Sequence, residues 1–315
     1  ATVQNQHRMR ALVVSNMAPD TGHPERGGFV RDQVAALREI DGLDVALHEF
    51  APGAYRAAAG ELRRRHRGVR YDVVHAHFGL TAVPALVVRA DRRAVTLHGR
   101  DLRHPRSRRI TTAVLPTQRL LGIAAEDLRA WLPRPFRARA RALPVGFAVD
   151  RFGPVDRAEA RRRLGLDPAE PFLLFPYGAD RRVKRVDRAR ELGEAVGVPV
   201  RTLGGIPPEQ MRDWLNAAAV VVIPSEHEGF GLAAVEALAC EVPVLATPTG
   251  AHPDTVGRVE GCLCAPWDLE TWSAAARDAL RHEDPRVAGS TVAAEHGTGP
   301  YAARVAAAWR DLLDR

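Results

Sequence analysis

The stretch PSEHEGFGLAAVEALACEVPVLATPTG, at residues 224–250, joins a predicted strand to a helix and then to a second strand. The first strand ends at Ser225, and the helix begins near Leu232 and contains Glu236. The loop between them holds Glu228, Gly229, Phe230 and Gly231. Glycines at such a junction let backbone N–H groups approach an anion at the positive end of the helix. The stretch therefore predicts an α/β unit with an anion-binding turn.

Short apolar runs alternate with longer helical patterns along all 315 residues. Continuous apolar runs are typical of strands that are covered on both faces, as in parallel sheets with crossover helices. The sequence therefore predicts two doubly wound, Rossmann-like α/β domains. The predicted strands are residues 11–15, 45–50, 72–78, 94–98, 112–117 and 141–145 in the first half, and 172–178, 199–204, 219–225, 243–248 and 262–265 in the second.

The stretch GFAVDRFGPVD, residues 146–156, is rich in Gly, Pro and Asp and lacks helical periodicity, so we predict that it links the domains. Residues 1–8 are interpreted as an extension. The N-terminal domain is predicted at residues 9–147 and the C-terminal domain at 148–298. A last helix at 299–315 is expected to pack back towards the N-terminal domain.

Charge is divided unevenly between the halves of the chain, whose net charge is +7. The first 150 residues contain 25 Arg against 14 acidic residues, whereas the remainder has 20 basic against 24 acidic. The basic clusters lie at residues 63–67, 89–93, 103–109 and 134–141. They are interpreted either as solvated faces or as contacts to an anionic small molecule or membrane surface. Nucleic acid is disfavoured, because aromatic residues make up only 6% and no recognition motif interleaves them with the clusters.

Cysteine usage and hydropathy exclude several classes of protein. The three cysteines are an odd number and lack zinc-type histidine spacing, so neither a disulfide framework nor a metal site is expected. No run of about 18 apolar residues occurs, and the N-terminal stretch is too polar for a signal peptide. We therefore predict a cytoplasmic protein, with peripheral contact to the inner membrane face left open.

Glu228 and Glu236 flank the helix start. One carboxylate lies in the loop and the other on the first turns of the helix, so both can face one ligand that lies across this point. From the residues alone, the alternative is a solvated loop charge and a first-turn acid favoured by the helix dipole.

This segment resembles the signature of retaining glycosyltransferases of family four, in which a Glu, seven residues and a second Glu flank GFGL. Residues 143–154, LPVGFAVDRFGP, resemble the linker of that family. Residues 201–225 resemble its base-binding stretch, and VTLHGRD at 95–101 resembles its histidine loop. The chain departs from the family at Ala179, where an arginine usually follows the glycine, and at Arg185 and Glu241, where the family has glycine.

The resemblance implies the two-domain GT-B fold, with domains that face a cleft, an acceptor side at 9–147 and a nucleotide-sugar side at 148–298. In that family the first Glu contacts the transferred sugar, the second contacts the ribose, and the amides between them contact the sugar and phosphates. Carried over by position, these roles fall on Glu228, on Glu236, and on the backbone of Gly229, Phe230, Gly231 and Leu232. Ile206 lies in the base-binding stretch.

Lys184, in RRVKRVD at 181–187, is the only lysine among the 45 basic residues. It occupies the place where the resembling family binds phosphate. An ammonium is a compact point charge that can enter a notch between phosphate oxygens, whereas a guanidinium is broad and planar. We therefore predict that Lys184 neutralises a diphosphate together with Arg181 or Arg182; survival by chance on a solvated face is the alternative.

Two further places in the first half are candidates for the site. His98 ends an apolar strand and precedes Gly99, and ligands of parallel sheets gather beyond the carboxyl ends of strands. From the residues alone a structural role is favoured, whereas the resemblance places the matching histidine beside the anomeric carbon. The pair Gly27 and Gly28 precedes an amphipathic helix, where the family meets the donor phosphate.

His75 and His77 in HAHFG suggest a metal pair only weakly, because no third ligand accompanies them, and packing is preferred. No G-x-G-x-x-G follows the first strand, which argues against a dinucleotide oxidoreductase.

The resulting prediction is a retaining, hexosyl-type glycosyltransferase that moves a sugar from a nucleoside-diphosphate sugar to an acceptor hydroxyl. Its catalytic residues are predicted to be His98 and Glu228. No metal or other cofactor is expected, and the acceptor is either neutral or anionic. The alternative is a non-catalytic nucleotide- or nucleic-acid-binding protein of the same fold.

Overall fold

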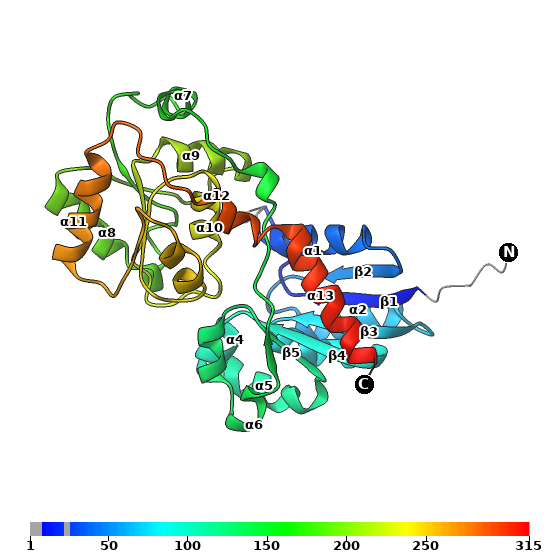
Figure 1. Cartoon of the computed structure of the whole chain (residues 1–315). Coiled ribbons are helices and arrows are strands. Elements are labelled where there is room, and N and C mark those ends of the chain that lie inside the picture. Colours follow the sequence, from blue (N-terminus) through cyan, green and yellow to red (C-terminus); the bar gives the residue numbers. More distant parts are fainter. Residues whose placement is uncertain (1–7, 22–25, 315) are drawn as a thin grey trace. The chain divides into compact units, whose positions relative to one another are not determined.

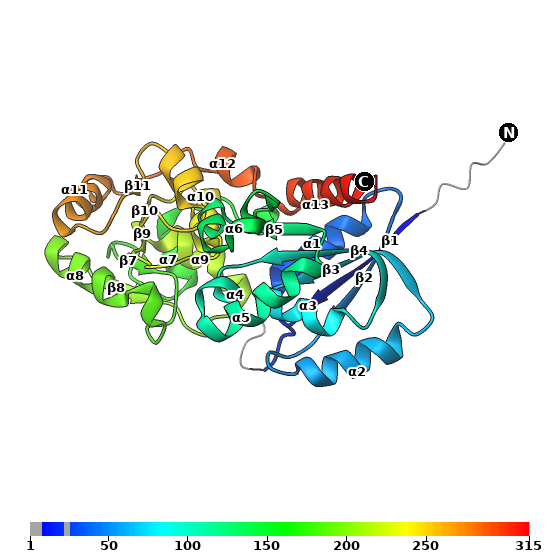
Figure 2. The same cartoon turned by 90° about the horizontal axis from the view of Figure 1, so that it is seen from below.

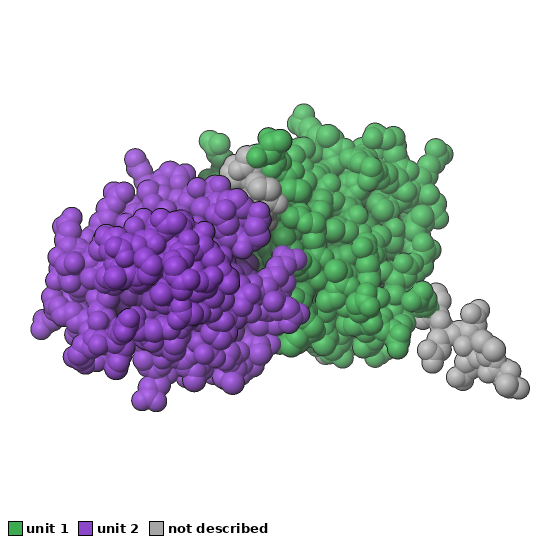
Figure 3. Space-filling model, turned by 90° about the horizontal axis from the view of Figure 1, so that it is seen from above, with its two compact units in different colours: residues 1–146, 298–315 green, residues 147–297 purple. Residues whose placement is uncertain are grey.

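Strands rich in Val, Leu and Ala form two separate parallel sheets in the computed structural model, which describes residues 8–21 and 26–314. The predicted extension at 1–8 therefore lies outside the described residues, apart from Arg8. Each sheet belongs to its own compact unit (Figure 3). The first unit comprises the described residues up to Gly146 and from Thr298 onward, and the second comprises Phe147–Gly297. Among the described residues, no helix combines the length and the apolar character needed to cross a bilayer.

The first unit is built on a six-stranded sheet of order β2-β1-β3-β4-β5-β6, in which all pairs are parallel. Its strands are β1 (Met9–Ser15), β2 (Leu43–Glu49), β3 (Arg70–His77), β4 (Arg89–Leu97), β5 (Leu120–Ile123) and β6 (Ala140–Ala142). Its helices are α1 (Gly28–Arg38), α2 (Tyr55–Arg65), α3 (Gly79–Ala85), α4 (Arg100–Arg103), α5 (Pro105–Val114), α6 (Arg134–Arg137) and α13 (Thr298–Leu313).

Alternating residues of β1 show how both faces of this sheet are covered. Ala11 and Val13 pack in one core with α1 and α13, whereas Leu12 and Val14 pack in a second core with α2 and α3. Figure 2 shows α13 and α2 on opposite sides of the sheet. Because both faces are buried, the strands are apolar at consecutive positions, which is why they are recognisable as continuous runs.

The second unit has a five-stranded parallel sheet of order β11-β10-β9-β7-β8. Its strands are β7 (Leu173–Phe175), β8 (Val200–Thr202), β9 (Val220–Ile223), β10 (Val244–Ala246) and β11 (Leu263–Cys264). Its helices, labelled in Figure 1, are α7 (Arg157–Arg163), α8 (Val186–Val196), α9 (Met211–Ala217), α10 (Leu232–Ala239), α11 (Leu269–Leu280) and α12 (Ser290–Ala294). Two doubly wound α/β domains were predicted, and the structure confirms them.

One predicted strand is wrong. Residues 112–117 belong to the end of α5 and to a short 3₁₀ helix at Leu115–Thr117, and the fifth strand is β5 instead. Thr111, Val114 and Leu115 are buried at helical spacing, three and four residues apart. Pro116 also has no N–H to donate, so it is unsuited to a strand that has neighbours on both sides.

Candidate active site

The residues of the second unit that were predicted to bind the sugar donor follow β7 and β9, the two strands between which the order of strand addition reverses. From β7, the chain builds β8 on one side, and β9 then pairs with the other side of β7. Ligands of open α/β sheets bind beyond the carboxyl ends of strands at such a switch point. The loop after β7 carries Lys184, and the loop after β9 carries Glu228. The backbone N–H of Glu226 donates to the carbonyl of Val183 at 2.9 Å and joins the two loops.

Lys184 and Glu228 form a buried ion pair, with side chains 8% and 5% exposed. The Lys184 ammonium donates to Oε2 of Glu228. Oε1 of Glu228 accepts from the hydroxyls of Ser225 at 2.7 Å and Tyr177 at 3.1 Å. The ammonium also lies 4.1 Å from the centroid of the Tyr177 ring. One carboxylate thus receives three donors, two from the connection after β7 and one from its own loop after β9, which fixes its orientation.

Opposing effects set the ionisation of this pair. Burial would raise the pKa of Glu228, but the charge of Lys184, together with His252 and the hydrogen bonds from Lys184 and Ser225, holds it below its ordinary value. Burial lowers the pKa of Lys184, while Glu228 acts to raise it. At neutral pH, the pair is a carboxylate and an ammonium held away from solvent.

The structure separates the two candidate arginines. Arg181 is exposed, and its guanidinium lies 5.6 Å from the centroid of Tyr177, the ring that also faces Lys184. Arg182 instead lines a shallow hollow of about 430 Å³ with Val183, Arg185 and Glu226 among others. Arg181 therefore shares its surroundings with the ion pair, and Arg182 does not.

The loop from Gly229 to Leu232 packs tightly against the turn after β10. Gly231 caps α10 with φ of 105°, and a Cβ placed there would lie 2.5 Å from Nε2 of His252. Gly250 has φ of 62°, and its Cβ would lie 2.6 Å from the carbonyl oxygen of Phe230 and 2.7 Å from Cβ of Glu228. Both positions need glycine for the backbone angle and for the close approach. The glycines hold the Glu228 loop in one place.

Glu236 lies on α10, half-buried, and its carboxylate forms no hydrogen bond or ion pair with residues 8–21 and 26–314. Burial raises its pKa to about 7. A carboxylate in this state is available to accept hydrogen bonds from a ligand.

Ile206 follows β8, the edge strand next to β7, and is partly exposed. Gly204, two residues before Ile206, lies close to Gly178 in the loop after β7: a Cβ at Gly204 would lie 3.4 Å from Cα of Gly178. The loop that carries Ile206 thus lies along the same edge of the sheet as the Lys184 loop.

At two departures from the family pattern, the backbone retains a positive φ although the residue is not glycine. Arg185 and Glu241 stand where the family has glycine, and both adopt positive φ, 58° and 61°. The backbone keeps the conformation that glycine favours. Arg185 is held by ion pairs with Asp187 and Glu226, and Glu241 by a hydrogen bond of 2.9 Å from Ser290.

In the first unit, His98 directly follows β4. The buried carboxylate of Asp101 accepts from the backbone N–H groups of His98 at 3.2 Å, Gly99 at 2.9 Å and Gly79 at 3.1 Å. Burial raises the pKa of Asp101, and these N–H groups oppose the change. Asp101 therefore fixes the turn that presents His98, although the sequence indicated it only as part of a motif.

His98 is the outermost member of a row of histidines. Its Nε2 lies 3.0 Å from Nδ1 of His77, and the rings of His77 and His75 stack at 5.3 Å. Trp309 of α13 donates from Nε1 to Nδ1 of His75 at 3.0 Å, and Nε2 of His75 lies 2.8 Å from the hydroxyl of Thr96. Because an indole only donates, the proton of neutral His75 is on Nε2. Both nitrogens of His75 are thus engaged, and packing rather than metal binding is its role.

The three rings are neutral at ordinary pH. Burial lowers the pKa of His75 and of His98 to about 3, and it lowers that of His77 well below its usual value. His98 is therefore suited to hydrogen bonding and not to carrying a positive charge.

Gly27 and Gly28 begin α1 beside this row. Gly27 has φ of 73°, and a Cβ there would lie 2.3 Å from the carbonyl oxygen of Met17. The next residue, Phe29, places its ring 5.4 Å from that of His98 and 5.9 Å from that of His77. The structure therefore brings the glycine turn and His98 together at the carboxyl edge of the first sheet.

Sequence reasoning missed Tyr177, Ser225 and Trp309. Tyr177 and Ser225 lie at the ends of predicted strands, which was a signal that could have identified them. Trp309 lies about 230 residues from His75 along the chain, so no local pattern reveals that contact.

Comparisons with known proteins identify the family of the chain and its fold. A family model described as "Glycosyl transferases group 1" matches residues 169–282. The D-inositol 3-phosphate glycosyltransferase of Mycobacterium marinum is 30% identical over 329 residues, which cover 86% of this chain and 68% of the relative. Sucrose-phosphate synthase from Thermosynechococcus elongatus has a similar structure, with a TM-score of 0.77, 21% identity, and coverage of 98% and 100%.

The Anabaena protein Alr3699/HepE in complex with UDP and glucose is similar with a TM-score of 0.72 and 15% identity, over 96% of this chain and all of that one. These structural likenesses establish the fold, which is of the predicted GT-B type.

Proposed function

The chain belongs to the group 1 glycosyltransferase family, and from this premise we propose that it transfers a hexose-type sugar from a nucleoside diphosphate to an acceptor hydroxyl, with retention of the anomeric configuration. Membership of an enzyme family replaces the alternative of a non-catalytic binding protein. The observation that carries the proposed donor is the buried pair of Lys184 and Glu228 at the switch point of the second sheet.

Lys184 is assigned to the diphosphate. The leaving group gains negative charge as the glycosidic bond breaks, and a fixed ammonium in a dry site stabilises that charge. Of the two candidate arginines, Arg181 is the second cation, because it shares the Tyr177 ring with Lys184. These two charges serve the purpose that a divalent metal serves in other transferases, so we propose that no metal takes part.

Glu228 is assigned to the sugar and Glu236 to the ribose. Glu228 is held ionised and oriented by three donors, so it can accept sugar hydroxyls without reorganising. Glu236 accepts from the ribose hydroxyls, and the backbone from Gly229 to Leu232 approaches the phosphates and the sugar. Ile206 contacts the base. In the Anabaena complex, the bound molecules are UDP and glucose, which supports a donor of this class.

His98, neutral and positioned by Asp101 and His77, is assigned to a hydrogen bond with the sugar or acceptor. Gly27 and Gly28 admit the donor phosphate to the start of α1. These roles rest on the resemblance and on the position of the residues at the carboxyl edge of the first sheet.

An anionic acceptor is proposed from the name of the relative, which acts on D-inositol 3-phosphate, and from the charge of the first unit. The cluster at 103–109 comes soon after His98. In contrast, 63–67 precedes β3, 89–93 forms the first half of β4, and 134–141 leads into the start of β6, so these three clusters lie towards the opposite edge of the sheet. We therefore place the acceptor's charge near 103–109. Exposed Val83 on α3, Leu86 at the C-cap of that helix and Ile110 on α5 would suit an acceptor that is embedded in the cytoplasmic face of a membrane.

The experiment is a thermal-shift panel of UDP-, GDP-, ADP- and TDP-sugars, followed by titration of the best donor. A donor at 100 times its dissociation constant raises the unfolding free energy by about 2.7 kcal/mol. We expect Arg181→Ala to weaken binding by about 10- to 100-fold, the value of a charge-assisted hydrogen bond. Arg182→Ala is the matched control and should remain within threefold. Equal losses in both variants, or no shift with any donor, would contradict the assignment.

A further inference from the structure

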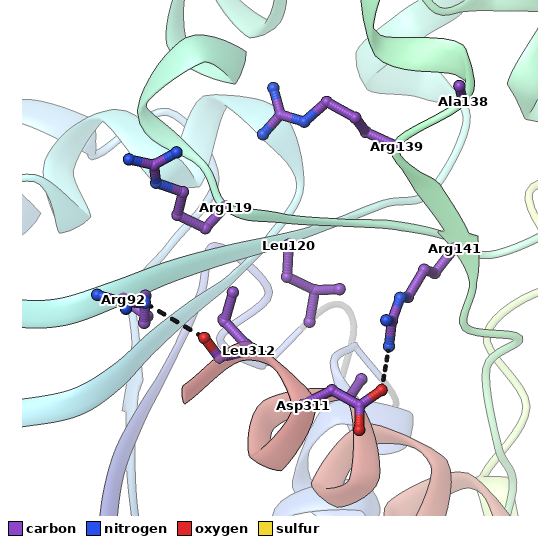
Figure 4. A pocket seen from close by; sticks show the side chains of 9 residues that line it. Arg92, Arg119, Leu120, Ala138, Arg139, Arg141, Asp311 and Leu312 are labelled. Carbon is purple, nitrogen blue, oxygen red and sulfur yellow. Dashed lines mark hydrogen bonds and ion pairs between the residues drawn. The ribbon is translucent and has the colours of Figure 1, made fainter. Parts of the chain in front are cut away.

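A hollow of about 650 Å³ lies in the first unit (Figure 4). It is at the amino edge of the sheet, opposite to the carboxyl edge at which His98 lies. We name it the arginine hollow; its polar lining is Arg92, Arg119, Arg139, Arg141 and Asp311. Arg92 is near the start of β4, Arg119 precedes β5, and Arg139 and Arg141 flank the first residue of β6. All four arginines therefore belong to the amino edge of the sheet.

The hollow is separate from the candidate active site. Arg92 and His98 are six residues apart on or just beyond β4, which corresponds to about 20 Å of extended chain. The hollow joins arginines of two clusters that the sequence showed as separate, 89–93 and 134–141. Neither cluster is explained by sugar transfer at the opposite edge.

The charges in the hollow are unbalanced. The lining contains four guanidinium groups and one carboxylate, that of Asp311, and its other residues are apolar. Arg141 donates from Nη1 to Asp311 at 2.8 Å, and Arg92 donates from Nε to the carbonyl of Leu312 at 3.2 Å. A structural role accounts for these two arginines, because both bind the last turn of α13, where backbone carbonyls attract cations.

Arg119 and Arg139 are not explained in this way. Neither forms an ion pair with any residue of the described ranges 8–21 and 26–314. Arg139 donates from Nη2 to the carbonyl of Gln118 at 2.7 Å and lies 5.7 Å from the ring of Phe136, so its direction is fixed. In Figure 4, Arg119 and Arg139 extend over the same side of Leu120. A fixed, uncompensated guanidinium beside a second one favours a ligand with negative charge.

We propose that the arginine hollow binds a small anion that carries two or more phosphate groups. Guanidinium groups match phosphate oxygens bidentately, and several of them from different segments match several phosphates. The volume is within the range of small-molecule sites and exceeds what one phosphate ion would fill. A large polyanion is less suitable, because a concave site with a carboxylate on one wall fits a compact ligand better than an extended one.

The experiment measures binding of inorganic tripolyphosphate to the whole chain by calorimetry, at 0.1 M NaCl in a buffer without phosphate. We expect Arg119→Ala/Arg139→Ala to raise the dissociation constant at least tenfold. The control is Arg190→Ala/Arg281→Ala, which removes two exposed arginines of the second unit and should change the constant less than twofold. Thermal unfolding of each variant verifies that it is folded.

Further arms of the experiment determine whether the anion binds elsewhere on the chain. Arg181→Ala should leave the affinity for tripolyphosphate unchanged. If Arg181→Ala lost this affinity and Arg119→Ala/Arg139→Ala kept it, the anion would bind at the donor site and the proposal would be overturned. Equal weakening in both double variants would show that tripolyphosphate responds only to net charge. Binding of duplex DNA or anionic phospholipid vesicles that depends on Arg119 and Arg139, without binding of tripolyphosphate, would replace the small anion by a macromolecular surface. Failure of the proposed sugar transfer would affect none of these measurements.

Discussion

At the scale of single residues, the pair of Lys184 and Glu228 is better explained by chemistry than by stability. A buried ion pair loses hydration on both partners, and an apolar pair of equal volume is commonly as stable or more so. Removing one partner, in contrast, leaves a charge buried alone. The chain keeps its one lysine at this place, where the ring of Tyr177 and the carboxylate of Glu228 both contact the ammonium.

Substitution of this pair should separate folding from function. Lys184→Met should destabilise the fold by about 3–5 kcal/mol, because Glu228 is left unpaired. Lys184→Met/Glu228→Gln should recover most of that stability yet remain without transfer activity. Lys184→Arg keeps the charge but not the shape, and we expect a 100- to 1000-fold loss of rate. Urea unfolding and donor turnover are the measurements; a double variant as unstable as Lys184→Met, or an active Lys184→Arg, would refute this interpretation.

Glu236 gives a prediction that depends on pH. Its pKa in the fold, about 7, is above the ordinary value of 4.5, so the folded state holds the proton more tightly than the unfolded state. Below pH 4.5, Glu236 is protonated in both states and does not reduce the unfolding free energy. As the pH rises from 4.5 through 7, the unfolded state releases this proton before the folded state does, so the unfolding free energy falls. Glu236→Gln cannot ionise, and it should be more stable than the wild type by about 1–3 kcal/mol at pH 8 and similar at pH 4.

The same substitution should weaken donor binding, because the ribose loses an ionised acceptor. Melting temperatures between pH 4 and 8.5, with and without donor, test both effects. A Glu236→Gln variant that is no more stable at pH 8, or that binds donor as the wild type does, would contradict the assigned role.

At the scale of elements, the sequence predicted ten of the eleven strands of the described residues, because buried parallel strands are apolar on both faces. It failed at 112–117, where TAVLPT has strand-like composition but continues a helix. The apolar run LLGI of β5 is only four residues long and directly follows Arg119, so it is a weaker strand signal than the neighbouring run at 112–117. Boundaries of edge elements were also less accurate: β6 ends at Ala142, three residues before the predicted end.

The candidate site was predictable where residues share a loop and less so where they meet across the fold. Glu228 and the glycines after it were identified from one stretch. Which arginine accompanies Lys184 was not, since the sequence does not show that Arg181 lies over Tyr177. The contact of Trp309 with His75 likewise depends on α13 returning to the first sheet.

A glycine substitution tests the loop packing. Gly250→Ala should destabilise the fold by about 2–5 kcal/mol, the cost of positive φ plus a clash with the carbonyl of Phe230. Because that clash also displaces Glu228, donor binding should fall. Gly197→Ala is the matched control, with φ of 72° and no atom within 4 Å of the added Cβ. It should cost about 1–2 kcal/mol and leave binding unchanged; similar behaviour of the two variants would mean that the loop tolerates displacement.

At the scale of the whole molecule, the basic residues of the first half are divided by the sheet. Reversing charge at the carboxyl edge, with Arg106→Glu/Arg109→Glu, should raise the Michaelis constant of an anionic acceptor several-fold at low salt. The effect should disappear at about 1 M salt, where the Debye length is about 3 Å. Arg63→Glu/Arg64→Glu, at the amino edge, is the control of equal charge. If this control raises the constant as much, the position of the cluster has no importance.

Helix α13 completes the first unit. Tyr301, Val305 and Trp309 are fully buried in the core that also contains α1. Deletion of residues 298–315 should therefore unfold or loosen the first unit, while the second keeps its protection. Hydrogen exchange of both units in the shortened chain is the measurement, and strands β1 and β3 should lose most protection. Unchanged exchange in β1 would show that the helix is dispensable.

This arrangement has a consequence for biosynthesis. The second unit is one continuous run, whereas the first is completed by α13, which is synthesised after the whole second unit. A ribosome adds about 5–20 residues each second, so the roughly 150 residues of the second unit take about 8–30 s to emerge. During that interval, the apolar face formed by α1 and by Ala11 and Val13 of β1 waits for its covering helix. That face is the surface a chaperone would meet on the nascent chain.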